Sequence, residues 1–223
     1  MFWLLLSLLF CSLIFREFRS TTTVPIDLPL EQSVWRPYVF VLAVLALLSI
    51  WQPMDTWLFE RRLSAIATEL ADSHVAHVHC NTVIDTMFDP NSTNIGHANP
   101  ETGEIAFQYP WCNRLQAYIR HPQRADNEEL ESLGLLSHES MHVRGEHNEA
   151  RTECAAVQRN FRTAKLLGVS VDVAKKNSLE YYDSIYEARA YKSGNPDQYF
   201  SDECAPGKEM DEALRDSTWA SRY

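Results

Sequence analysis

The chain has 223 residues, of which 45% are hydrophobic and 22% are charged, and such proportions are ordinary for a globular protein. Its formal net charge is −10 at pH 7. Nucleic-acid-binding proteins usually carry a basic stripe, and the sequence shows none. We therefore expect no nucleic-acid partner.

Two uncharged apolar segments come first along the chain. Residues 37–54 are about long enough to cross the hydrocarbon core of a bilayer and are flanked by tryptophans. Residues 2–15 are shorter, and they lack the basic start and the small-residue cleavage site of a signal peptide. We predict a membrane anchor over residues 1–57 with transmembrane helices at both segments. A cleaved signal is the alternative for the first segment.

Residues 58–223 show the alternation of patterns expected of an α+β domain. Apolar residues at helical spacing over 58–70 lead into short β-like runs, and the last two of these runs enclose turn residues. We expect a small sheet with a hairpin, followed by helices. The predicted strands are 75–80, 95–98 and 104–109, and the predicted helices are 126–145, 148–167, 171–192 and a short one at 209–214.

Four cysteines lie in this domain, and no two of them form a Cys-x-x-C pair. The absence of that spacing argues against a zinc knuckle or a redox motif. The even number of cysteines favours two disulfides, which form outside the cytoplasm. We predict the pairs Cys80–Cys112 and Cys154–Cys204, because the hairpin between the first two would bring its flanks together. The domain is accordingly expected on the extracytoplasmic side of a membrane. Four free thiols in the cytosol are the alternative.

Residues 136–154 read LSHESMHVRGEHNEARTEC and place two histidines on one predicted helix. Four residues advance about 400° along an α-helix, so His138 and His142 lie on one face, about 6 Å apart. Both imidazoles can therefore reach one ion. Zinc accepts neutral histidine nitrogens, and a catalytic zinc keeps one position for water. We predict one zinc ion here, with Glu139 beside it as the proton acceptor.

The third metal ligand is less narrowly defined by the sequence. Gly145 can end the first helix in a left-handed conformation, so that the next helix runs back alongside it. Counting outward from Gly145 then brings Glu149 and Glu153 level with the histidine pair. We favour Glu149, while Glu153, His147 and a residue farther along the chain stay open.

The arrangement His138-Glu139-x-x-His142 resembles the H-E-x-x-H motif of the zinc metalloproteases called zincins. Residues 148–153 also resemble the Asn-Glu-x-x-x-Asp/Glu element of the gluzincin branch. That resemblance implies Glu149 as the third ligand and Glu153 as the partner of His138. The spacing departs from the thermolysin-like enzymes, whose glutamate lies much farther along the chain.

The metzincin pattern H-E-x-x-H-x-x-G-x-x-H fits less well. Gly145 matches its glycine, but Asn148 stands where that pattern has its third histidine. A neutral amide is a poor substitute for an imidazole. The gluzincin-like interpretation is therefore preferred.

The resemblance implies a membrane-anchored zincin-like domain that hydrolyses peptide bonds with zinc-activated water. Its substrate would be a peptide or protein, which could pair with the strand at 104–109 by strand addition. The alternative is a non-catalytic, zinc-stabilised membrane protein that acts as an interaction module. An open water position on the metal would favour the enzyme, and a closed four-ligand site would favour the module.

Overall fold

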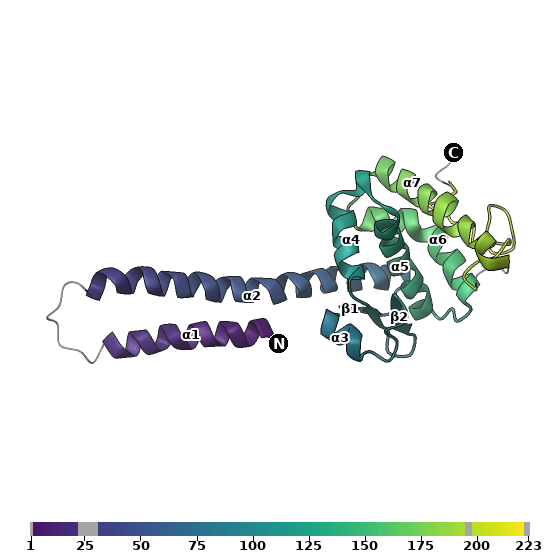
Figure 1. Cartoon of the computed structure of the whole chain (residues 1–223). Coiled ribbons are helices and arrows are strands. Elements are labelled where there is room, and N and C mark those ends of the chain that lie inside the picture. Colours follow the sequence, from purple (N-terminus) through teal and green to yellow (C-terminus); the bar gives the residue numbers. More distant parts are fainter. Residues whose placement is uncertain (1, 22–30, 195–197, 221–223) are drawn as a thin grey trace. The chain divides into compact units, whose positions relative to one another are not determined.

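The computed structural model describes residues 2–21, 31–194 and 198–220. It divides into two compact units, Met1–Phe59 and Glu60–Tyr223. Both units contain helices, and the second also contains a three-stranded sheet (Figure 1). The chain is therefore an α+β protein, as the sequence predicts.

Two helices, α1 (Phe2–Thr21) and α2 (Glu31–Leu70), contain the apolar segments. Helix α2 continues through Pro37 and Pro53, so the apolar run and the predicted helix at 58–70 form one element. Among the described helices, only the stretch Pro37–Leu70 is long and apolar enough to cross a membrane.

The sheet consists of β1 (His77–Cys80), β2 (Gly96–Asn99) and β3 (Glu104–Phe107), each close to a predicted strand. Their order is β1-β3-β2, with β1 parallel and β2 antiparallel to β3. Alternate residues point to the core, as the period of a strand requires: Ile105 and Phe107 are buried. The buried face packs against α5.

Two helices were not predicted from the sequence: α3 (Val83–Phe88), which lies between β1 and β2 in the chain, and α4 (Trp111–Arg120), which follows β3. A short 3₁₀ turn, Pro122–Arg124, follows α4. The disulfide Cys80–Cys112 joins the end of β1 to the start of α4, and Cys154–Cys204 joins α6 to the tail. The predicted disulfide pairing is confirmed.

The centre of the domain is a helical hairpin of α5 (Asn127–Arg144) and α6 (Glu149–Leu166). A capping box formed by Asp126 and Glu129 begins α5, and Gly145, with a φ of 107°, ends it. Only glycine adopts that left-handed conformation at little cost. The predicted reversal of the chain at Gly145 is therefore present.

The predicted helix at 171–192 is helical throughout but changes its winding twice. Helix α7 (Val171–Glu180) continues as a π-helical turn, η2 (Tyr181–Tyr186), and then as a 3₁₀ helix, η3 (Glu187–Gly194). Four side chains of the wide turn are buried, three of them tyrosines. The change of winding thus turns large aromatic side chains into the core.

The prediction of a short helix at 209–214 is wrong. Residues 209–210 form a turn and residues 211–214 have no regular secondary structure, with a φ of 51° at Ala213. The carboxylate of Asp211 accepts hydrogen bonds from the backbone N–H groups of Gly207 and Ala213. Side-chain bonds of this kind replace the backbone bonds that a helix would make.

Glu212 ties this tail to the helical hairpin. Its carboxylate accepts hydrogen bonds from Arg159 at 2.7 and 3.0 Å and from Arg144 at 2.9 and 3.1 Å. Partial burial would raise the pKa of Glu212, but the hydrogen bonds from Arg159 and Arg144 outweigh it and lower the pKa to about 2. The folded state therefore favours the ionised carboxylate.

We expect Glu212→Gln to lower the free energy of unfolding at pH 7 by about 1 kcal/mol, a modest value because solvent screens this half-buried group. Folding lowers the pKa of Glu212 from about 4.5, its value in the unfolded chain. The ionised carboxylate therefore stabilises the fold fully at pH values above about 4.5. The difference between wild type and variant should therefore shrink as the pH falls from about 4.5 toward 2.

Urea unfolding of the detergent-solubilised chain across a pH series would measure this difference. Glu209→Gln, a change at an exposed carboxylate of the same tail, is the matched control. Equal stability of the Glu212 and Glu209 variants at pH 7 would contradict the expectation.

Candidate metal centre

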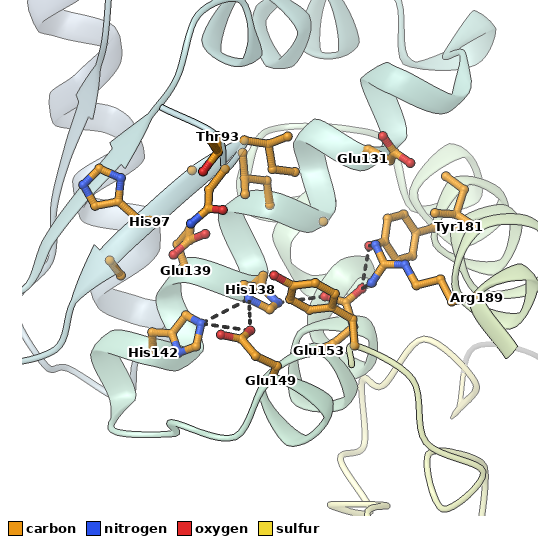
Figure 2. A pocket seen from close by; sticks show the side chains of 18 of the residues that line it. Thr93, His97, Glu131, His138, Glu139, His142, Glu149, Glu153, Tyr181 and Arg189 are labelled. Atoms are coloured by element: carbon orange, nitrogen blue, oxygen red, sulfur yellow. Dashed lines mark hydrogen bonds and ion pairs between the residues drawn. The ribbon is translucent and has the colours of Figure 1, made fainter. Parts of the chain in front are cut away.

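The helical hairpin brings two imidazoles and one carboxylate together near its turn (Figure 2). The Nε2 atoms of His138 and His142, one turn apart on α5, are 3.1 Å from each other. Glu149, the first residue of α6, places its Oε2 atom 3.2 Å from Nε2 of His138 and 3.5 Å from Nε2 of His142. These three side chains offer donor atoms within 4.8 Å of one another, a separation that one metal ion can bridge.

The turn after Gly145 sets the position of Glu149. The side chain of Asn148 caps α6 by accepting a hydrogen bond from the N–H group of Arg151. The carboxylate of Glu146 accepts hydrogen bonds from the backbone N–H groups of residues 147 and 148. Asn148 therefore has a capping role here, and Glu149 begins the helix directly beside the histidines.

The second nitrogen of each imidazole is bonded to an acceptor. Nδ1 of His142 donates to the backbone carbonyl of Glu146 at 2.8 Å, and Nδ1 of His138 lies 2.7 Å from Oε2 of Glu153. A carbonyl and a carboxylate only accept, so both Nδ1 atoms carry a proton. The Nε2 atoms therefore remain to bind a cation, the arrangement typical of histidine metal ligands.

Glu153 is a buried carboxylate with three partners. Besides His138, it accepts a hydrogen bond from the hydroxyl of Tyr181 at 2.7 Å and forms an ion pair with Arg189 at 2.8 Å (Figure 2). Burial raises the pKa of Glu153, but the charge of Arg189 and the hydrogen bonds outweigh it and lower the pKa. The carboxylate thus stays ionised in the interior.

In the absence of a metal ion the two histidines bind protons more tightly than usual, and Glu149 binds a proton less tightly. Burial lowers the pKa of His138, but Glu149 and Glu153 reverse this effect and raise it to about 10. The hydrogen bond to His138 and that to His142 lower the pKa of Glu149 to about 2. A positive charge between these groups is therefore strongly favoured, whether a proton or a metal ion supplies it.

Glu139 lies in the same pocket as the three donor groups. It is buried, and within the part of the chain that the structure describes its Oε2 atom has no hydrogen-bonding partner. Burial raises the pKa of Glu139, and the neighbouring histidines only partly oppose this. A buried, unpartnered carboxyl group with a raised pKa has the properties of a general base or acid.

These residues line a pocket of about 690 Å³ between the hairpin, η2 and the segment 93–100. The sheet borders this pocket with β2, which is an edge strand. Strand β3, at which we expected strand addition, is the central strand and is paired on both sides. That expectation is wrong, because the parallel pairing with β1 occupies the second edge of β3.

The other candidate ligand named from the sequence, His147, lines the same pocket but is not one of the three residues with clustered donor atoms. The pocket residues that were missed include Arg189 and Tyr199, whose ring centroid lies 5.7 Å from that of His138. Arg189 is the one basic residue in the aromatic stretch 181–191, a signal that could have suggested a buried acidic partner. Tyr199 gives no comparable signal in the sequence.

No family model, no curated protein and no solved structure matches this chain. The function is therefore inferred from the residues and their geometry alone.

We expect Arg189→Met to lower the free energy of unfolding by about 3–5 kcal/mol, because it removes the charge that does most to keep the buried Glu153 carboxylate ionised. The double variant Glu153→Gln/Arg189→Met removes both charges and should recover a large part of the loss. Urea unfolding with a metal chelator present measures both values without a contribution from bound metal.

Arg151→Met, at an exposed arginine of α6, controls for the loss of a positive charge and should change stability little. A double variant no more stable than Arg189→Met would show that the ion pair is not what stabilises the fold.

Proposed function

We propose that this chain is a membrane-anchored, zinc-dependent peptidase of the zincin kind, with its domain on the extracytoplasmic side. The observation that carries the proposal is the cluster of His138, His142 and Glu149 beside the unpartnered carboxyl group of Glu139. Two supporting features are the two disulfides and the helix that could cross a membrane.

The donor set fits zinc better than calcium or magnesium. Two imidazole nitrogens and one carboxylate oxygen match the three protein ligands of many catalytic zinc sites, whereas Ca²⁺ and Mg²⁺ prefer oxygen ligands alone. The Nδ1 bonds to Glu146 and Glu153 already orient both rings with Nε2 toward Glu149. Three ligands leave one position for water or substrate, which favours an enzyme over a closed structural site.

Each residue then has a distinct role. His138, His142 and Glu149 hold the ion, and Glu153 orients His138 and increases its basicity. Zinc at this position would polarise a peptide carbonyl and activate water for attack. Glu139 would take the proton from the water and pass it to the leaving amine.

The pocket suits an extended peptide. Strand β2 borders it as an edge strand, since among the described strands β2 pairs with β3 alone. A peptide that adds to this edge gains backbone hydrogen bonds whatever its side chains are. We therefore propose unstructured protein segments as the substrate class and β2, in place of β3, as the strand that binds them.

We expect the purified full chain to contain one zinc ion, and His138→Ala and Glu149→Ala to lose it with a lower melting temperature, because metal binding stabilises only the folded state. Glu153→Ala should weaken zinc binding by about 10- to 100-fold, because it removes the hydrogen bond that orients the ligand His138. Elemental analysis and chelator competition measure these effects.

His121→Ala and Glu187→Ala, at an exposed histidine and an exposed glutamate, are the matched controls and should keep their zinc. Absence of stoichiometric zinc from the folded wild-type chain would remove the basis of the proposal. A larger loss with Glu153→Ala than with Glu149→Ala would make Glu153 the third ligand.

Glu139→Gln should keep zinc and the fold, while hydrolysis of an unstructured protein falls by at least about 10²-fold, the lower range for a lost general base. Glu131→Gln, at a carboxylate that lines the same pocket, is the control and should retain most of the activity. Zinc content and turnover are measured on the same preparations.

Loss of zinc in Glu139→Gln would show that Glu139 is a ligand. Stoichiometric zinc in a wild-type chain that hydrolyses nothing would instead favour the non-catalytic, zinc-stabilised interaction module.

A further inference from the structure

The short helix α3 turns its apolar side away from the domain. None of its residues is buried, and the exposed fractions are 49% for Val83, 66% for Ile84, 72% for Met87 and 81% for Phe88. At 100° per residue these four side chains cover an arc of about 140° on one side of the helix. Soluble domains rarely leave such a group of large apolar side chains uncovered.

The polar residues of α3 hold it to the domain. The hydroxyl of Thr86 accepts a hydrogen bond from the backbone N–H of Tyr109 at 2.9 Å, and Asp85 completes a capping box with Thr82. Just after the helix, Asp89 accepts hydrogen bonds from Gln108 at 2.7 Å and from Asn81 at 3.0 Å. The exposed apolar face is thus a fixed feature of the fold, because hydrogen bonds join residues 81, 86 and 89 to the segment 107–109.

Contacts within the second unit place α3 next to the end of α2. The carboxylate of Glu60 accepts a hydrogen bond from the backbone N–H of Cys80 at 2.8 Å and lies 2.9 Å from Nδ1 of His79. Thr82, the cap of α3, is two residues beyond Cys80. Glu60 itself directly follows Trp57, Leu58 and Phe59 in the helical stretch that is apolar and long enough to cross a membrane.

We propose that α3 inserts its apolar face into the lipid interface of the membrane that α2 crosses. A lipid surface is the occupant that the position of Glu60 favours, because a helix that leaves a bilayer there brings α3 to the same boundary. Interfacial helices bury an apolar face of this kind at the level of the headgroups. This inference rests on the membrane anchoring in the proposed function and is independent of the metal centre.

The charge around α3 defines the kind of lipid contact. Residues 81–113 contain no lysine or arginine, and the polar side of α3 carries Asp85. The segment that contains α3 therefore offers no lysine or arginine to an anionic headgroup. The contact is apolar, so it forms on zwitterionic lipid and persists at high salt.

The test uses the full chain with Cys11→Ser, which removes the free cysteine outside the two disulfides, reconstituted into nanodiscs of phosphatidylcholine. A nitroxide spin label is attached at Met87→Cys. The matched control is a label at Val171→Cys, a large apolar residue on α7 that is 57% exposed. Power saturation compares collisions with oxygen, which dissolves in lipid, and with a nickel chelate, which stays in water.

The expected result is an excess of oxygen over nickel collisions at position 87, unchanged at high salt, and an excess of nickel collisions at position 171. Nickel access at position 87 equal to that at position 171 would overturn the proposal, because α3 would then face water. Protection of position 87 from both reagents would also overturn it and would show that a protein surface covers α3.

Failure of the chain to enter nanodiscs would overturn the membrane anchoring itself and, with it, the role of α3. Entry of the chain with a water-exposed α3 would refute only the role of α3. The two failures are therefore distinct, and zinc content is measured separately from both.

Discussion

The buried carboxylate of Glu153 is the constraint on which the rest of the domain depends. An ionised group removed from water is costly unless it is paired and hydrogen-bonded. Each of its three partners comes from a different element: His138 from α5, Tyr181 from η2 and Arg189 from η3. Satisfying this one charge therefore fixes three elements against α6 and sets the orientation of an imidazole at the metal centre.

This constraint also accounts for the close contact between α5 and η2. A Cβ atom at Gly134 would lie 2.6 Å from the ring of Tyr181, so a side chain there would displace the tyrosine that donates to Glu153. Gly134 costs some helix stability, and that cost is offset by the hydrogen bond it permits. The sequence alone showed only a glycine inside a helix.

Helix caps, turn residues and the spacing of apolar residues correctly predicted the elements that form between residues close in the sequence. The capping box at Asp126, the left-handed Gly145 and the helical spacing of apolar residues predicted the hairpin, and the hairpin in turn brought the candidate ligands together. The turn at 99–103 predicted the pairing of β2 with β3 in the same way. Each of these features is determined within a few residues.

The features that the sequence did not predict depend on distant partners or lack a periodic signal. Helix α3 has no buried face, so its pattern did not stand out as an element. The parallel pairing of β1 with β3 and the position of Arg189 follow from tertiary packing. In the tail, where a helix was predicted at 209–214, the carboxylate of Asp211 accepts hydrogen bonds from the backbone N–H groups of Gly207 and Ala213 instead.

The three donor groups and the buried acid behind them all fall within residues 138–153, on two helices joined by one short turn. All the ligands thus lie in one short continuous segment of sequence. This segment could be grafted as a single peptide onto another helical scaffold. The recipient would have to supply a cation in the place of Arg189, since a graft without one would carry an uncompensated charge into a new interior.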